Sequence, residues 1–542
     1  MEEISKTTPS LKSQSAWLLF AKVVGFAFSF LLPLLIVRFL TQDKVGVYRQ
    51  VFLVVTNAVA ILPLGVSISA YYFLSRETER RASSVFNILI FNFVMGGLAC
   101  LALFFYPQIL GNIFHNEEIT RLAPKIGVVI WFWIFSSFLE TVAIANQETR
   151  MATAFIILAQ FTKTLLMVSA VILFATVEAF VYAAMIQAVL QTIVLLIYLN
   201  SRFPQFWKSF DFKFFREQLV YALPFGLASL LWTLQSDIHN YFVGYKFSAS
   251  DYAVYAYGCF ELPLIAMISE SVTSVLIPRM SRLQSENDKR EMIRLTMRAM
   301  QKLAFFYFPI YIFLVITAET FIVTLFTSTY KASVPIFLIN ITLMPFYIWI
   351  VDPIVRAYKE LGRFLLTLRI FIFTALISAL FFGIQNFDLR GMIAIVVVAV
   401  LTEKLISSIA ILRKLEVERA DIYLLKDVVK TAACAMFAGI FTFLFYWQLN
   451  EKLAAFGAQF AQNILGFSKM SIIEFISGVF VLASSFMIFA PVYLLSANFF
   501  DIIDDDEKQS IMSFIVRLKG RHGNTETRRK DKIRNPQSTI QN

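Results

Sequence analysis

Ionisable side chains inside long apolar stretches are the residues of this chain best suited to do chemistry. Lys22 lies in the first such stretch, Asp237 in the seventh, and Glu261 and Glu270 in the eighth. A charge surrounded by hydrocarbon costs about 2.5 kcal/mol or more. Each of these residues must therefore face protein or water, and each is a candidate for function.

Small and polar residues share helical faces with two of these charges. At helical spacing, Lys22 falls beside Gly25 and Ser29, and Asp237 falls beside Asn240. Such a face points toward a neighbouring helix or a cavity rather than toward lipid.

The two signs of charge divide between the two parts of the chain. The basic residues of the first part suit a phosphate or pyrophosphate, because lysine is a point charge and arginine a planar fork. The acidic residues of the second part suit a coupling cation, a proton or sugar hydroxyls. The predicted substrate-binding residues are Lys22, Arg49, Lys163 and Asn240. The predicted coupling or gating residues are Asp237, Glu261, Glu270, Asp352 and Arg356.

Structural explanations compete for several of these charges. Arg38 and Arg49 lie near the outer rim, where extension toward headgroups explains them as well as ligand contact does. Glu140 and Lys163 lie at depths that let them neutralise each other, which we favour over a role in binding. His239 is interpreted as a satisfied interior residue.

Two pairs of charges follow helix geometry directly. Asp352 and Arg356 are four residues apart and can pair with each other. Two nearby prolines favour bends, so this pair marks either a hinge or a packed kink. Glu403 and Lys404 are adjacent, so they point in different directions and each needs its own partner.

The elements that must position these residues are membrane-spanning helices. Of the 542 residues, 58% are hydrophobic and 16% are charged, which excludes a soluble globular protein. A helix needs about 20 residues to cross roughly 30 Å of hydrocarbon, and continuous apolarity argues against barrel strands. We predict an all-α polytopic membrane protein with about fourteen spans, at 16–37, 47–73, 84–106, 125–145, 152–175, 179–199, 219–243, 252–277, 299–317, 334–355, 364–382, 391–412, 428–449 and 472–495.

The distribution of basic residues predicts the orientation of the chain. Lysine and arginine concentrate in alternate gaps, which places both termini in the cytoplasm. The stretch 16–37 is longer than a signal-peptide core and has no small-residue cleavage site, so we expect it to remain as a span. The net charge of +11 then reflects topology and contact with membrane lipids, and no nucleic-acid partner is expected.

Several classes of function are not supported by the sequence. The three cysteines lie in apolar stretches, which argues against disulfides and zinc, and the three histidines form no metal cluster. There is no Walker-type loop and no Ser/His/Asp set within the spans. We therefore expect a transporter without catalytic residues, metal or cofactor.

The basic gap at 201–218 mixes aromatic and charged residues, as an interfacial linker does. We predict a cytoplasmic arm at 1–15, a first lobe at 16–200, the linker at 201–218, a second lobe at 219–412, an extra helix pair at 428–495, and a tail at 500–542 with an amphipathic helix and a disordered basic end. A weak repeat supports two parallel halves, since residues 38–48 resemble residues 246–255.

Short patterns along the chain resemble the polysaccharide-transport branch of the MOP exporter superfamily, the O-antigen (Wzx-type) flippases of lipopolysaccharide biosynthesis. The matching residues are Arg38-Phe39-Leu40-Thr41 through Gly46-Val47-Tyr48, Tyr221-Ala222-Leu223-Pro224, Val254-Tyr255 and Val275-Leu276-Ile277-Pro278. The resemblance implies two lobes around a central cationic cavity and alternating access. It also implies an undecaprenyl-pyrophosphate-linked oligosaccharide as cargo in the cytoplasmic membrane, where other polysaccharide-assembly proteins are candidate partners.

Within this resemblance, Lys22 and Arg49 fit the position of pyrophosphate-binding basic residues, whereas spans seven and eight are acidic rather than basic. Coupling to a sodium or proton gradient, or consumption of the product outside, would supply direction. Two rival functions are a cation-coupled small-molecule antiporter of the same superfamily and an integral-membrane glycan polymerase or ligase. A polymerase is disfavoured because no large outer loop is predicted.

Overall fold

Helices make up all of the regular secondary structure in the part of the chain that the computed structural model describes, residues 11–77 and 79–502. Thirteen helices are long and apolar enough to cross a membrane, and the apolar part of α1, Val23–Phe39, adds a shorter one. These fourteen segments correspond one for one to the predicted spans, so the all-α polytopic membrane fold is confirmed. Nearly all of the predicted tail lies outside the described residues.

The spans are formed, in chain order, by α1 (Leu11–Phe39), α2 (Gln42–Ile61), α4 (Arg81–Phe105), α6 (Glu117–Ser136) with α7 (Phe138–Ala145), α8 (Thr149–Leu173), α9 (Val177–Arg202), α10 (Phe212–Lys246), α11 (Ala249–Gly258) with α12 (Pro263–Ser285), α13 (Lys289–Phe326), α14 (Val334–Ile341) with the 3-10 turns Ser328–Ser333 and Met344–Ile348 on either side, α16 (Lys359–Asn386), α17 (Leu389–Leu415), α19 (Lys426–Gln459) and α20 (Met470–Phe499). Shorter helices connect them, namely α3 (Ser69–Arg76), α5 (Gln108–Phe114), α15 (Asp352–Ala357) and α18 (Arg419–Ile422).

Two of the spans in the second half are interrupted. The eighth span breaks between α11 and α12, at residues 259–262, and α12 then begins at Pro263. The tenth span passes from α14 through a 3-10 turn (Met344–Ile348) to α15, whose second residue is Pro353. Proline at a helix start lacks only an N–H that would have no partner there. Both breaks interrupt the helical hydrogen bonding of an apolar span, and within a membrane this is tolerated only where protein or water surrounds the backbone.

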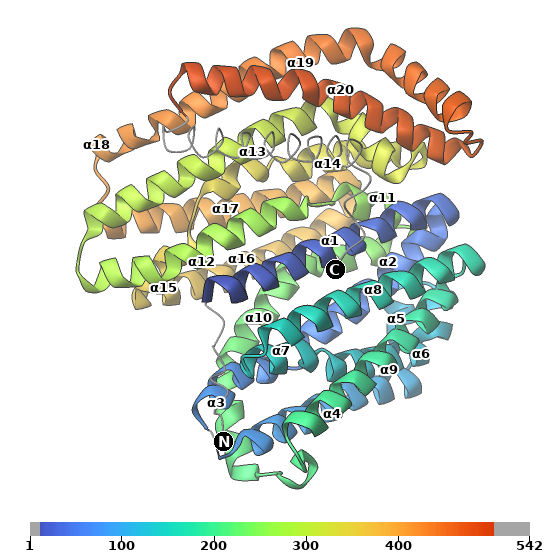
Figure 1. The fold of residues 1–542 in the computed structure, drawn as a ribbon, viewed down its shortest axis with the longest axis vertical. Helices are drawn as coiled ribbons and strands as arrows, with labels where there is room; N and C mark the ends of the chain where they lie inside the picture. The colour runs from blue at the N-terminus through green and yellow to red at the C-terminus, as the bar shows by residue number, and fades with distance from the viewer. Residues whose placement is uncertain (1–10, 78, 503–542) are drawn as a thin grey trace, which may run out of the picture.

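The helices form two groups with α10 between them, as Figure 1 shows. Helices α1–α9 form one group, drawn in blue and teal, and α11–α20 form the other, drawn in green to red. Within the second group, α19 and α20 pack on each other and on α13, at the edge of the molecule. Helix α10 packs against α2, α4 and α5 of the first group and α16 and α17 of the second.

Helix α10 begins inside the segment predicted to be an interfacial linker. Its first residue is Phe212, because the carboxylate of Asp211 accepts a hydrogen bond from the N–H of Phe214 and so caps the helix. The part of the linker that remains non-helical is short, and it includes a 3-10 turn at Phe206–Lys208.

The two segments of the predicted repeat begin helices with the same backbone conformation and contact each other, although only Ser248 caps its helix with its side chain. Thr41 precedes α2 with φ −68° and ψ 154°, and Ser248 precedes α11 with φ −61° and ψ 160°. A Cβ atom on Gly46 would lie 1.7 Å from the carbonyl oxygen of Ala249, so only glycine allows this approach. We call this end of the bundle, where α1 meets α2, the α1–α2 end.

A second close approach predicts a large effect on stability. A Cβ atom on Gly226 would lie 2.0 Å from the carbonyl oxygen of Leu64, at a turn where Gly65 has φ +72°. Gly226→Ala should therefore push α10 away from this turn and destabilise the fold by about 1–3 kcal/mol. The measurement is thermal unfolding of the purified protein. Gly362→Ala is the matched control, since its Cβ would meet only one atom, at 3.9 Å; equal melting temperatures for the two variants would contradict the prediction.

Candidate functional site

The structure brings three of the predicted residues together between α2 and α10. Asn240 donates a hydrogen bond from Nδ2 to Oδ1 of Asp237 at 3.4 Å. Asn57 of α2 lies within hydrogen-bonding reach of Asp237 and donates from Nδ2 to the hydroxyl of Tyr241 at 3.2 Å. Arg49 is the positive charge that acts on Asp237. These five residues form a polar cluster between the first group of helices and α10.

Arg49 reaches across to the second group of helices. Its Nη2 donates to the carbonyl oxygen of Ala256 at 3.2 Å, and its Cζ lies 5.0 Å from the ring centroid of Tyr257. The side chain is half-buried. Arg49 therefore contacts α11 in this conformation, a contact that neither of the two explanations drawn from the sequence included.

Glu261 lies in the break between α11 and α12, facing the other interrupted span. The hydroxyl of Tyr347, in the 3-10 turn of the tenth span, donates to Oε1 of Glu261 at 3.4 Å. The ammonium group of Lys404 lies 5.1 Å from the ring centroid of Tyr347. Glu270 is exposed further along α12. The carboxylate of Glu261, the phenol of Tyr347 and the amine of Lys404 thus lie close together beside the two breaks.

The predicted pairing of Asp352 with Arg356 is confirmed, with Oδ2 and Nε 2.7 Å apart at the start of α15. Helix α15 packs on α12, which carries Glu270. A pair this exposed is screened by solvent and contributes little to stability, which leaves both side chains free to exchange partners.

Of the other candidate residues, the structure shows contacts for Lys163 and His239 but does not describe the side chain of Lys22. The ammonium group of Lys163 lies 4.7 Å from the ring centroid of Trp133, a cation–π contact, and its pairing with Glu140 stays a prediction. Lys22 belongs to α1, and its side chain lies outside what the structure describes. His239 is buried and its Nδ1 lies 2.8 Å from the hydroxyl of Tyr255, so it has a partner, as we expected.

A family model for polysaccharide biosynthesis proteins matches residues 35–335, which is more than half of the chain. The chain belongs to this family. No curated protein matches it in sequence.

Solved structures show that this family member has the fold of the MOP superfamily transporters. The lipid II flippase MurJ, in an inward closed conformation, has a TM-score of 0.66 at 14% identity and covers 91% of this chain and 99% of its own. An inward-facing MATE multidrug transporter has a TM-score of 0.58 at 14% identity, covering 72% and 94%. A MOP superfamily transporter from Pyrococcus furiosus has a TM-score of 0.53 at 17% identity, covering 76% and 97%. At these identities the likeness shows the fold that the chains share.

One ion pair of this family member was missed in the sequence. Arg369 of α16 places Nε 3.0 Å from Oε1 of Glu403 on α17, and Gln235 of α10 donates from Nε2 to Oε2 of the same carboxylate. The guanidinium also lies 5.2 Å from the ring centroid of Trp232. Glu403 and Lys404 have different partners, as their adjacency predicted. The sequence did contain a signal for this ion pair, because Arg369 is a charged residue at the sixth position of the predicted span 364–382.

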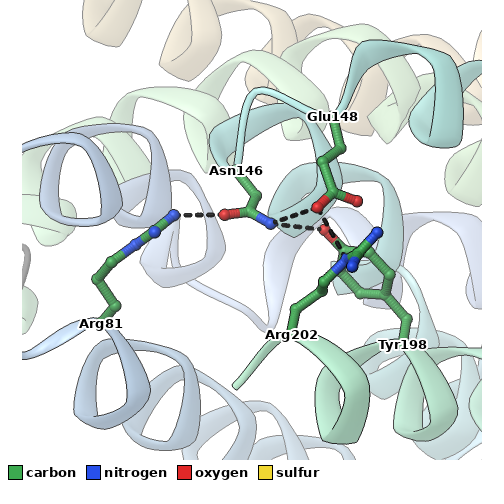
Figure 2. A network of polar contacts seen from close by, with 5 residues as sticks. All are labelled: Arg81, Asn146, Glu148, Tyr198 and Arg202. Carbon is green, nitrogen blue, oxygen red and sulfur yellow. Dashed lines mark hydrogen bonds and ion pairs between the residues drawn. The ribbon is translucent and has the colours of Figure 1, made fainter. Parts of the chain in front are cut away.

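A second network lies inside the first group of helices, and Figure 2 shows its five residues. Glu148 accepts hydrogen bonds at Oε1 from Nε of Arg202 at 2.8 Å and from Nδ2 of Asn146 at 3.1 Å. Asn146 also donates from Nδ2 to the hydroxyl of Tyr198, and its Oδ1 accepts a hydrogen bond from Nη2 of Arg81. The network joins α4, the junction of α7 with α8, and α9. All five residues belong to one group of helices, so we assign the network to stabilising that group.

Proposed function

We propose that this member of the polysaccharide biosynthesis protein family is a flippase for a lipid-linked oligosaccharide. Its cargo would be an undecaprenyl-pyrophosphate-linked glycan, moved across the cytoplasmic membrane by alternating access for surface polysaccharide synthesis. The family match and the MOP transporter fold, which extends over most of the chain in the MurJ likeness, support this class of function.

The observation that carries the proposal concerns α10 and α12. These helices are the two least buried of the thirteen apolar spans, and with α2 they are also the three least apolar. Their exposed side chains include polar ones, such as Ser236 on α10 and Ser271 and Ser274 on α12, beside apolar ones, and polar side chains are costly against lipid tails. We infer that these exposed faces, with Asp237, Glu261 and Glu270, line a hydrated path between the two groups of helices.

Such a path solves the physical problem of moving a glycan. Sugar hydroxyls and phosphates lose their hydration in hydrocarbon, which costs several kcal/mol for each unpaired polar group. Lys22, Arg49 and Lys163 would neutralise the pyrophosphate, and Asn240 would bond sugar hydroxyls. The polyprenyl tail would stay in the surrounding lipid throughout.

The orientation follows from the positive-inside rule. We propose that both termini face the cytoplasm and that the α1–α2 end faces the outside. In the conformation described, Arg49 joins the two groups of helices at that end, which corresponds to closure toward the outside.

Deletion of the gene tests the function directly. Lipid-linked glycans should then accumulate, and one polyprenyl-pyrophosphate oligosaccharide should build up on the cytoplasmic face of the membrane. Its sugar composition would identify the cargo. An unchanged lipid-linked pool, with surface polysaccharide intact, would contradict the proposal.

The nearness of Asp237 and Glu261 favours a second candidate, a cation-coupled exporter of small molecules. The carboxylate of Asp237 acts electrostatically on Glu261, and two neighbouring carboxylates suit a cation or a proton. Raised drug susceptibility with normal polysaccharide in the deletion strain would select this function.

Two carboxylates of the proposed path, those of Asp237 and Glu270, predict how the flippase is coupled. Asp237→Asn and Glu270→Gln should alter the dependence of glycan export on the sodium or proton gradient, because each removes one negative charge from the path. Export is measured in vesicles with imposed gradients. Asp388→Asn, at the exposed N-terminal cap of α17, is the control. Export that keeps its original pH and sodium response in both variants would exclude these residues from coupling.

A further inference from the structure

The end of α13 is a strained helix terminus at the α1–α2 end. Thr327 has φ +72° and ψ 164°, an uncommon conformation for a residue other than glycine, and it stops the helix abruptly. The next N–H, that of Ser328, faces the carboxylate of Glu474 in α20, with Oε2 at 3.5 Å. The carbonyl groups of the last turn need partners from elsewhere, because a helix leaves its last four carbonyls without intrahelical bonds.

Arg38 of α1 supplies those partners from the other group of helices. Its Nη1 donates to the carbonyl oxygen of Leu325 at 2.9 Å and its Nη2 to that of Thr324 at 2.6 Å. Nη1 also donates to the carbonyl oxygen of Leu34 in its own helix. A cation at the negative end of the α13 dipole adds to the attraction. One forked side chain thus joins the ends of α1 and α13.

The helix pair α19–α20 closes over this joint. The ring centroid of Phe475 lies 5.1 Å from Cζ of Arg38, and Glu474 supplies an opposite charge that acts on the guanidinium. The ammonium group of Lys469 lies 3.8 Å from the ring centroid of Phe39 in α1. A Cβ atom on Gly478 would lie 1.9 Å from Oγ1 of Thr324, so α20 is seated directly on the end of α13.

We propose that Arg38 and the α19–α20 hairpin form a latch that holds α1 against α13 and keeps the α1–α2 end of the transporter closed. The proposal rests on alternating access, as proposed above, and assigns a role to a helix pair that otherwise lies at the edge of the molecule. Separation of α1 from α13 would break the charged hydrogen bonds of Arg38 and leave the carbonyls of Thr324 and Leu325 unpaired. The latch therefore favours the conformation described here over one that is open at this end.

A cysteine placed beneath the latch reports whether it is open. Ala256 is buried, its carbonyl is bound by Arg49, and the adjacent Tyr257 stacks on Phe326 at the end of α13 with centroids 4.3 Å apart. Ala256→Cys, in a chain whose three native cysteines are replaced by alanine, would be labelled in intact cells with a membrane-impermeant maleimide. The full-length protein is used throughout.

Removing the guanidinium should open this end. Arg38→Ala is expected to raise the labelling rate of the reporter about tenfold, because at least one charged hydrogen bond is lost only from the closed state. Arg38→Lys and Glu474→Gln should give smaller increases. Lys331→Ala is the matched control, since it breaks an exposed ion pair with Glu319 that lies within the second group of helices. Labelling of the Arg38→Ala variant at the parent rate would overturn the proposal.

Loss of folding and loss of the latch are separable. If Arg38→Ala fails to reach the membrane, two variants at partly exposed positions, Glu474→Gln and Lys469→Ala, test the latch instead. Labelling at the parent rate in both variants would overturn the latch. Glycan export is measured in parallel. Faster labelling together with no glycan export by the parent chain would support the latch and contradict the proposed flippase.

Discussion

Replacing Lys22 by alanine is expected to reduce glycan export by about tenfold to a hundredfold, because a charged hydrogen bond contributes about 1.5–3 kcal/mol. Lys22 is a positive charge on a small, polar face of the first span, where its charge is costly unless a polar partner or water is present. A pyrophosphate held beside α1 would be that partner for part of the transport cycle. Export is measured as surface polysaccharide and as the lipid-linked pool.

Two further variants make this prediction specific. Lys22→Arg keeps the charge and should therefore retain most export. If Lys22 had only a structural role, export would not depend in this way on keeping the charge. Lys44→Ala is the control at the rim of α2, where the ammonium group donates to the carbonyl oxygen of Ala175 within the first group of helices. Normal export by Lys22→Ala would remove this residue from the binding site.

The second large effect is expected at the ion pair between Arg369 and Glu403. The Glu403 side chain is 13% exposed and that of Arg369 30% exposed, so the carboxylate is the more buried partner. Arg369→Ala leaves this carboxylate at membrane depth without its counter-charge, with a cost of about 3 kcal/mol. The melting temperature of the purified protein should therefore fall by several degrees, as measured by thermal unfolding in detergent.

A double replacement distinguishes a charge effect from lost packing. Arg369→Met combined with Glu403→Leu removes both charges at similar volume, so it should be more stable than Arg369→Ala alone. A double variant that is as unstable as the single one would show that packing, rather than the unpaired charge, dominates. Arg356→Ala is the control, because its ion pair with Asp352 is exposed and contributes about 1 kcal/mol or less.

The positions of the spans followed from the sequence because apolar length alone determines whether a helix can cross a membrane. Contacts within one helix were also predictable, because they follow from helix geometry. The pairing of Asp352 with Arg356, and the divergence of Glu403 from Lys404, depend only on 3.6 residues per turn. The break before Pro263 was not predicted. Residues 252–277 had been expected to form one continuous span, whereas α11 ends at Gly258 and α12 begins at Pro263.

Contacts between helices were not predictable in the same way. Arg49 bonds the carbonyl of Ala256, and Arg38 bonds that of Leu325, 287 residues further along the chain. Every residue carries a backbone carbonyl, so these acceptors leave no signal in the sequence. Arg369 had a signal, a charge within an apolar stretch, but its partner Glu403 could be assigned only once α16 and α17 were seen to be adjacent.

Reconstitution of the full-length protein tests whether a hydrated path between the two groups of helices carries a glycan across the membrane. The polyprenyl-pyrophosphate oligosaccharide that accumulates in the deletion strain would be incorporated into liposomes with the purified protein. The sugar exposed on the outer leaflet would then be measured with an impermeant glycosidase. We expect the protected inner-leaflet glycan to become accessible in the presence of the protein, and much more slowly with Lys22→Ala. Protection equal to that in protein-free liposomes would contradict this expectation.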